Sequence, residues 1–322
     1  MGYIATLIDV TDGLPREIGG GERLLISAWV FIPVHPERVD GKCAVIVLLN
    51  GGTYDKRYWH ISVPGRSGYS MAEYLQERGH VIVLLDHLGV GESSRPLNGY
   101  VLDRHIAASA SQIAVTEIFD RLAKGQLDPS VPPLSPFVKV GVGHSLGGMQ
   151  LITQQAAYRT FDRIAITGYT AIGVHMVHDG EHKSGYLGPV DYSRPAYITV
   201  SHELVRETFF FPDIADDVIA VDTALTVDVP YVLIVQSSTA GIITKEASEI
   251  SVPVYICLGE IDVSPDPYSE PSYFRRSPQV TLHILKRSGH CQVLASTRVE
   301  MFDRINRWIS DNDLHSSPPG VA

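Results

Sequence analysis

The length, composition and charge of the chain limit what it can be. The sequence has 322 residues, 44% of them hydrophobic, and a formal net charge of −10 at pH 7, which fits one large α/β domain with an insertion, or two domains. An acidic chain without a basic cluster is not expected to bind nucleic acid, and no apolar run approaches the roughly 20 residues of a membrane-spanning helix.

Strands and helices alternate in the first part of the chain. Residues 22–33 lead into an apolar run that is predicted to form a strand paired with residues 3–9. The continuous apolar runs at 43–49 and 80–85 are typical of strands that are buried on both faces. Helical segments follow these strands, so that the order indicates parallel β-α-β units; the helical segments are 69–79 and 104–125.

A serine lies where a strand passes directly into a helix. The β-branched run that starts at residue 137 gives way to a helical pattern from residue 149, and the turn at 143–147 reads Gly-His-Ser-Leu-Gly, a match to G-x-S-x-G. In a nucleophile elbow this turn is strained and exposes the serine hydroxyl above the sheet. We therefore predict Ser145 as a catalytic nucleophile and the Leu146 N–H, at the helix N-terminus, as a donor to a developing oxyanion.

A dinucleotide-binding loop is the main alternative for these glycines. That loop requires G-x-G-x-x-G and an acidic residue at the end of the next strand. Here Gly147 comes one residue late for the third glycine, and Asp162 precedes the next apolar run instead of following it. The spacing therefore favours the nucleophile elbow.

A long insertion is predicted in the second half of the chain. One buried strand is predicted at 163–168 and the next at 252–258, and the gap of about 80 residues far exceeds the ~2–6-residue loops around one crossover helix. The gap is rich in tyrosine and phenylalanine, which fits a cap over a substrate pocket. The expected organisation is a core at 1–169 and 246–310, a cap at 170–245 and a frayed tail at 311–322, with a strand at 280–285 and a helix at 292–309 completing the core.

A histidine and an acid in suitable positions follow the last two strands. His290 comes between the last strand and the last helix, and Asp262 lies in the loop after the preceding strand. A serine needs a base to take its proton and a third group to orient that base. The order Ser145, Asp262, His290 is the order found in α/β-hydrolases. Glu260 remains the rival acid.

A second oxyanion donor is expected in the glycine turn after the 43–49 strand. That turn exposes backbone N–H groups, and we select Gly52 as the donor, with Thr53 as the alternative. An ordinary glycine turn would look the same in the sequence. Beside these elements, the residues expected to line the substrate pocket are Asn50, Thr53, Tyr54, His144, Tyr169 and Tyr186.

Taken together, these motifs resemble the α/β-hydrolase superfamily, specifically an esterase- or lipase-like serine hydrolase with an inserted cap. The resemblance covers about residues 40–310 and implies a mostly parallel central sheet flanked by helices, a cap between the sixth and seventh strands, and a Ser-His-Asp mechanism without metal or organic cofactor. One departure is that many members have His-Gly at the oxyanion loop. The motifs are Asn50-Gly51-Gly52, Asp86-x-x-Gly89-x-Gly91-x-Ser93, Gly143-His144-Ser145-Leu146-Gly147-Gly148, Gly259-Glu260-Ile261-Asp262 and Gly289-His290.

Other histidines and the cysteines suggest chemistry less specifically. His175, His178 and His182 could share one face of a helix and bind a metal, but spacing alone is weak evidence and a polar cap surface explains them better. Cys291 has no second histidine placed to act as its base, so it is expected to be a packed or pocket-lining thiol. With three cysteines, no C-x-x-C pair and no signal-peptide pattern, a cytoplasmic location is expected.

The function that these residues favour is hydrolysis of a carboxylic ester or lactone of a small to medium apolar molecule through an acyl-enzyme. The same fold and triad host other reactions, so C–C bond hydrolysis or a lyase or cyclase step stays open. A non-catalytic receptor that holds a ligand in the capped pocket is the alternative of another class. A small-molecule substrate is expected in each case, whereas the oligomeric state is not predicted.

Overall fold

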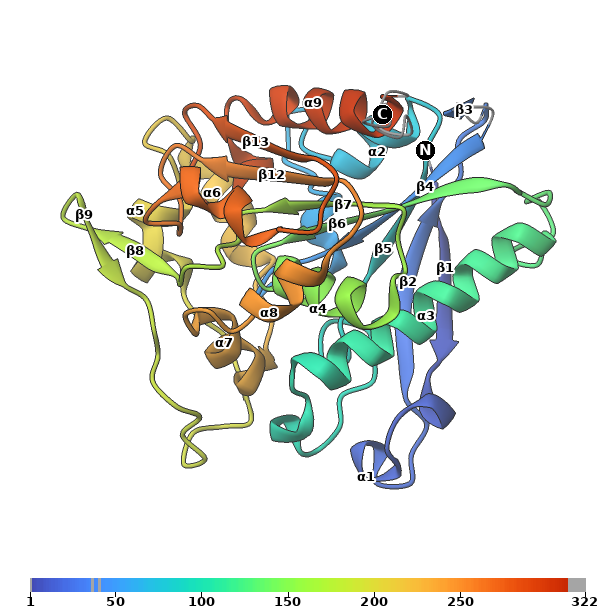
Figure 1. The fold of residues 1–322 in the computed structure, drawn as a ribbon, viewed down its shortest axis with the longest axis horizontal. Coiled ribbons are helices and arrows are strands. Elements are labelled where there is room, and N and C mark those ends of the chain that lie inside the picture. Colours follow the sequence, from blue (N-terminus) through green and yellow to red (C-terminus); the bar gives the residue numbers. More distant parts are fainter. Residues whose placement is uncertain (1, 36–37, 40–41, 312–322) are drawn as a thin grey trace, which may run out of the picture.

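One large sheet runs through the protein in this computed structural model, which describes residues 2–35, 38–39 and 42–311 (Figure 1). Within those residues the sheet has nine strands, eight of them in the order β1-β2-β5-β4-β6-β7-β12-β13, with β3 paired to β4. The tail predicted to be frayed, apart from residue 311, lies outside the described residues. Among the described helices, none has the length and apolar character needed to cross a membrane.

The sheet is mostly parallel, as the sequence predicts. β1 pairs antiparallel with β2, which confirms the predicted pairing of these two strands, and β2 is antiparallel to β5. From β5 to β13 every neighbouring pair is parallel. The strands are β1 (Ile4–Asp9), β2 (Leu25–Phe31), β3 (Arg38–Val39), β4 (Lys42–Leu49), β5 (Val81–Leu85), β6 (Phe137–His144), β7 (Arg163–Thr167), β12 (Val254–Gly259) and β13 (Val280–Leu285).

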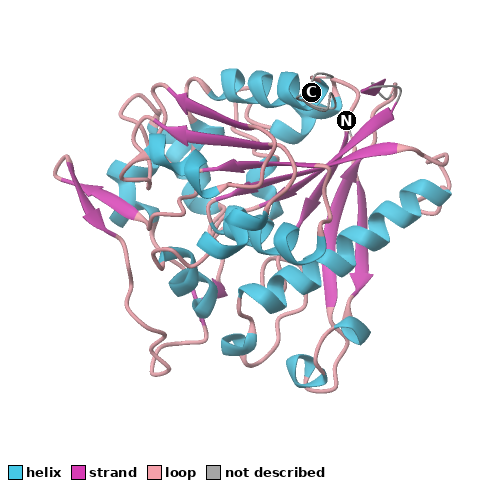
Figure 2. Cartoon of the chain, in the orientation of Figure 1, coloured by secondary structure: helices cyan, strands magenta, loops and turns pink. Residues whose placement is uncertain are grey.

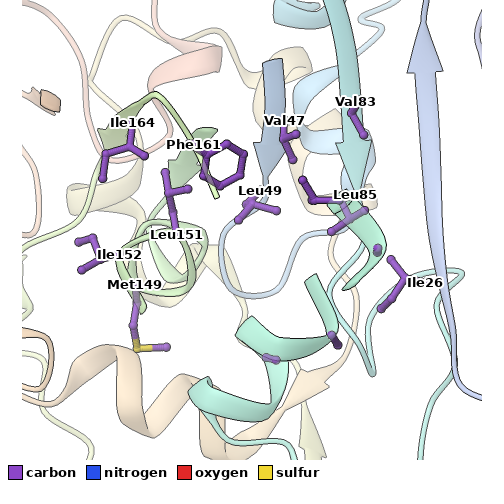
Figure 3. Packing of buried hydrophobic residues seen from close by; sticks show 14 of the residues in the cluster. Ile26, Val47, Leu49, Val83, Leu85, Met149, Leu151, Ile152, Phe161 and Ile164 are labelled. Atoms are coloured by element: carbon purple, nitrogen blue, oxygen red, sulfur yellow. The ribbon is translucent and has the colours of Figure 1, made fainter. Parts of the chain in front are cut away.

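Helices cover both faces of the sheet (Figure 2). Successive side chains of a strand point to opposite faces, so Val45, Val47 and Leu49 of β4 pack with the helices of one face, whereas Ile46 and Leu48 pack on the other. This explains why β4 is apolar at every position but the first. Figure 3 shows Val47 and Leu49 on the first of these faces. The first face carries α3 (Arg104–Lys124) and α4 (Leu146–Tyr158), and the second face carries α2 (Met71–Gln76) and α9 (Arg298–Ser310). The short helix α1 (Arg16–Gly19) lies between β1 and β2 in the chain.

The segment between β7 and β12 is built from short elements. It leaves the sheet at one side, and its β8–β9 hairpin projects from the body of the protein (Figure 1). Residues of this segment join the hydrophobic cores on both faces of the sheet, Leu233 on the face of α3 and α4 and Phe210 on the face of α2 and α9. The elements are β8 (His175–His178), β9 (Glu181–Ser184), β10 (Tyr197–Ile198), α5 (Arg206–Phe209), α6 (Asp216–Ala224), β11 (Val229–Pro230), α7 (Tyr231–Ser238) and α8 (Thr244–Glu249).

The local structure differs at two places from what the sequence suggested. His175, His178 and His182 do not share a helical face, because they lie on the two strands of the β8–β9 hairpin. Asp179 and Gly180 join these strands with φ values of 54° and 75°, and such positive angles in a two-residue Asp-Gly loop are typical of a tight hairpin. Among the described residues, no group of three or more His, Cys, Asp or Glu side chains is arranged to hold a metal ion.

The last helix also starts later than predicted. Residues 292–294 form a separate 3-10 turn, and the backbone is extended at Ala295 before α9 begins at Arg298. This break lets Gln292 turn toward the loop after β12, where its side chain contacts Asp262.

Candidate active site

The candidate nucleophile lies at a strained turn between β6 and α4. Ser145 has φ 52° and ψ −120°, a conformation that is costly for a non-glycine residue and is often retained at functional sites. The turn is tight enough to exclude side chains beside it. A Cβ on Gly143 would lie 2.4 Å from the carbonyl oxygen of Gly147, and a Cβ on Gly147 would lie 2.3 Å from that of Leu49.

The predicted base and acid lie next to this serine. His290 Nε2 is 3.0 Å from Ser145 Oγ, and His290 Nδ1 is 2.7 Å from Asp262 Oδ1. His290 and Asp262 are both almost fully buried. The structure therefore brings together the three side chains that the sequence selected. The rival acid, Glu260, is exposed and instead accepts from the backbone N–H of Arg287.

The Asp262 carboxylate is held by several donors. Oδ2 accepts from the backbone N–H of Gly259 at 2.7 Å and from Gln292 Nε2 at 3.0 Å, and Oδ1 accepts from the backbone N–H of Val263 at 2.7 Å. Such charge-assisted bonds fix the position of the carboxylate. Sequence reasoning missed Gln292. The signal available was its position two residues after His290, but the segment was assigned to a continuous helix.

The predicted oxyanion loop passes close to the serine. A Cβ on Gly51 would lie 3.2 Å from Ser145 Cβ, and one on Gly52 would lie 3.8 Å from Leu146 Cβ. Asn50, which occupies the position where many α/β-hydrolases have histidine, is fully buried and donates from Nδ2 to the carbonyl of Tyr54. Its side chain therefore closes the loop that contains the two glycines.

Two buried residues beside His290 stay uncharged. Burial, and then the neighbouring His290, hold the pKa of His144 well below its ordinary value. The His144 ring stacks on Tyr58 with centroids 4.7 Å apart, and lies 4.8 Å from the ring of His290. Burial raises the pKa of the Cys291 thiol well above its ordinary range, so Cys291 is a packed thiol here, with its sulfur 3.1 Å from the Tyr54 hydroxyl.

A cavity of about 330 Å³ opens above Ser145 and His290. Four of the six residues predicted for the pocket line it, together with side chains from the segment between β7 and β12 such as Met176 and Phe209. The remaining two lie elsewhere. Asn50 bonds to the carbonyl of Tyr54 across the glycine loop, and Tyr169 borders a separate small void. The four that line the cavity are Thr53, Tyr54, His144 and Tyr186.

Comparison with known proteins identifies the family of this chain. A family model described as the alpha/beta hydrolase family matches residues 46–303. The chain belongs to the alpha/beta hydrolase family. This membership supports a hydrolase activity, and the observed strand order confirms the predicted fold class. A search of curated protein sequences finds no match.

Solved structures with this fold resemble the chain over nearly its whole length. A bromoperoxidase from Bacillus anthracis is 16% identical, with 96% of this chain and 100% of that chain covered and a TM-score of 0.64. A thermophilic esterase from Thermogutta terrifontis is 14% identical, with 97% and 100% covered and a TM-score of 0.61. An esterase from Exiguobacterium antarcticum is 17% identical, with the same coverages and TM-score as the Thermogutta enzyme. At these identities the likeness concerns the fold.

Proposed function

We propose that this alpha/beta hydrolase is a serine hydrolase that cleaves a carboxylic ester or lactone. The observation that carries the proposal is the continuous hydrogen-bond chain from Ser145 through His290 to Asp262, with distances of 3.0 Å and 2.7 Å. A serine hydroxyl is a poor nucleophile unless a base takes its proton and a third group orients that base. The chain of contacts supplies both.

The proposed reaction proceeds through an acyl-enzyme. His290 Nε2 accepts the proton of Ser145 while the serine oxygen attacks the substrate carbonyl. His290 then donates this proton to the leaving alcohol, and water repeats the sequence to release the acid. The Asp262 carboxylate accepts from His290 Nδ1–H, so it selects the tautomer whose Nε2 is free to act and stabilises the imidazolium that forms.

Two backbone N–H groups are proposed to hold the oxyanion. Leu146 is the first residue of α4, so its N–H is among those that a helix leaves without an intrahelical partner. Gly52 lies beside Leu146 in the loop after β4. Removal of one such donor from an oxyanion hole costs about 10²–10³ in kcat, which makes this pair a large part of the expected rate enhancement.

The cavity supports a small to medium, largely apolar substrate. Its volume of about 330 Å³ is at the lower end of the ~300–1,000 Å³ range of ligand pockets. Val174, Met176, Leu187, Val205 and Ile234 give it apolar walls. All five belong to residues 170–245, which we propose as a cap over a core formed by 1–169 and 246–310.

Ester hydrolysis by matched variants tests the proposal. The wild-type protein is expected to release nitrophenol from p-nitrophenyl acetate or butyrate, and Ser145→Ala to lose at least about 10³-fold in kcat/KM, as removal of a triad nucleophile does in other hydrolases. The matched control is Ser237→Ala, which removes a different serine hydroxyl from the cavity wall and should leave turnover close to that of the wild type. Equal turnover by wild type and Ser145→Ala would reject the mechanism.

Diketone substrates separate ester hydrolysis from C–C bond cleavage on the same triad. Turnover of a diketone but of no ester, abolished by Ser145→Ala, would keep the nucleophile and change the bond that is cleaved. Absence of turnover with every substrate, together with no reaction of Ser145 with a fluorophosphonate, would favour a ligand-binding receptor instead.

A further inference from the structure

A second histidine–carboxylate pair lies in the wall of the same cavity. His202 Nδ1 is 2.6 Å from Asp222 Oδ2, and His202 Nε2 is 2.7 Å from Thr53 Oγ1. The Tyr54 hydroxyl donates to Asp222 Oδ1 at 2.6 Å. The unit therefore ends in the hydroxyl of Thr53, directly after Gly52 in the chain.

This unit is separate from the Ser145 relay. The ring of Phe209 contacts both histidines, with centroids 5.0 Å from His202 and 4.8 Å from His290. Asp222 is fully buried and His202 is 2% exposed. Burial of an ionisable pair carries a desolvation cost that apolar side chains of similar volume would avoid. The Ser145 mechanism does not use the pair.

Thr53 itself is held in an unusual backbone conformation. Its φ is 65°, which is rare for a β-branched residue. The hydrogen bond between Thr53 and His202 fixes the side-chain rotamer in that conformation, and both residues line the cavity. The threonine oxygen is thus held in a single orientation within the cavity wall, so a hydrogen bond to it would cost little side-chain entropy.

The protons shared by Thr53 and His202 determine whether Thr53 Oγ1 can donate or accept a further hydrogen bond. Thr53 Oγ1 lies 2.7 Å from His202 Nε2 and 2.6 Å from the carbonyl oxygen of Gly52. When Nε2 carries no proton, the hydroxyl donates to it. When Nε2 is protonated, it donates to Oγ1 and the hydroxyl donates to the Gly52 carbonyl. In either state the hydroxyl proton is used within the protein, and a lone pair of Oγ1 is left to accept.

We infer that Thr53 Oγ1 is a hydrogen-bond acceptor for the substrate and that His202 and Asp222 are positioning residues for it. The site then prefers esters that carry a hydroxyl or N–H group close to the scissile carbonyl, because Thr53 adjoins the loop proposed to hold that carbonyl. A keto group at the same place gains nothing, since it cannot donate. This inference rests on the proposed ester hydrolysis at Ser145.

Three matched ethyl esters test this inference, namely ethyl butyrate, ethyl 3-hydroxybutyrate and ethyl acetoacetate. Their hydrolysis is measured through the proton that each released acid gives up. The measured quantity is the ratio of kcat/KM for the hydroxy ester to that for ethyl butyrate, which cancels effects common to both. Thr53→Val is expected to lower this ratio about 3- to 10-fold, the size of one neutral hydrogen bond. Thr53→Ser is expected to preserve it, and the keto-to-butyrate ratio is expected not to change in Thr53→Val.

Two further variants sharpen the result. Ser237→Ala removes another hydroxyl of the cavity wall and is expected to leave the hydroxy-to-butyrate ratio unchanged. His202→Phe keeps an aromatic ring beside Phe209 and Tyr54 but removes both nitrogens, and it is expected to lower the ratio as Thr53→Val does. If His202→Phe does not fold, the comparison of Thr53→Val with Thr53→Ser still tests whether Thr53 is the acceptor.

The outcomes separate this inference from the proposed function. An unchanged ratio in Thr53→Val, or an equal fall of the keto ratio, would overturn the acceptor role while Ser145-dependent hydrolysis stands. A fall in Ser237→Ala alone would assign the acceptor to a different residue and would also overturn it. Hydrolysis that does not depend on Ser145 would overturn the proposed function, and with it the premise of this inference.

Discussion

The contact between Gln292 and Asp262 provides a quantitative test of how the acid is held. Gln292 Nε2 donates to Asp262 Oδ2 at 3.0 Å and to the carbonyl of Cys257 at 3.1 Å. Gln292→Leu removes both bonds and keeps the volume of a buried side chain. Neither acceptor is left without a partner, because Gly259 N–H still donates to Asp262 Oδ2 and Gly168 N–H still donates to the Cys257 carbonyl.

The expected loss follows from the charge on the acceptor. A hydrogen bond to a charged group contributes about 1.5–3 kcal/mol. Because Asp262 retains three other donors, we expect the lower value, and about 1.4 kcal/mol corresponds to a tenfold change in rate. Gln292→Leu should therefore lower kcat/KM for p-nitrophenyl butyrate about tenfold, mainly through kcat, since Gln292 does not line the cavity.

A matched control comes from Gln150 in α4, which is equally buried. Neither polar atom of its side chain has a hydrogen-bond partner in the described part of the chain. Gln150→Leu should change kcat/KM by less than about twofold, because no bond to a reacting group is lost. If Gln292→Leu is folded and hydrolyses the ester as fast as the wild type, the bond to Asp262 does not contribute to catalysis and the reasoning fails.

Three further predictions concern the acid, the thiols and the pH dependence of stability. Asp262→Asn should lower kcat about 10⁴-fold, as loss of a triad carboxylate does elsewhere. Glu260→Gln should alter kcat less than about twofold, since exposed ion pairs contribute little. A large loss in Glu260→Gln and a small one in Asp262→Asn would make Glu260 the acid. All three cysteines are buried, so a thiol reagent at pH 8 should react with none until denaturant is added, and rapid modification of the folded protein would contradict the packing. Burial keeps His144 neutral in the folded state by lowering its pKa well below 6.5. As the pH falls below that value, the unfolded chain therefore binds more protons than the folded one. The free energy of unfolding should then decrease by up to about 1.4 kcal/mol per pH unit because of this residue. Denaturant titrations from pH 7 to pH 5 should show a shallower decrease for His144→Phe than for the wild type, and identical slopes would contradict the assignment.

The fold was predictable from the sequence because its strands are buried on both faces. Runs such as 43–49 and 80–85 have few polar residues, and only a parallel sheet covered by helices accommodates several of them in alternation with helical segments. The three candidate catalytic residues were predictable for a related reason. The carboxyl ends of parallel strands meet at one edge of the sheet, so residues just after β6, β12 and β13 are brought close together although they are far apart in the chain.

The rest of the site depends on contacts that spacing does not encode. Thr53, His202 and Asp222 come from a loop after β4 and from two places in the segment between β7 and β12, and no periodic pattern relates them. Gln292 was hidden by a helical pattern that the extended backbone at Ala295 interrupts. The β8–β9 hairpin is a different case, because its Asp179-Gly180 turn is a recognisable hairpin signal that histidine spacing alone does not take into account.

Covalent labelling of the wild-type protein with a fluorophosphonate tests the central claim most directly. The account predicts an intact mass increased by one phosphonyl group, with the modified peptide mapped to Ser145 and no labelling of Ser145→Ala. Asp262→Asn should react much more slowly, because His290 loses the carboxylate that orients it. A wild-type protein that is folded yet unmodified, or is modified at a residue other than Ser145, would contradict the account.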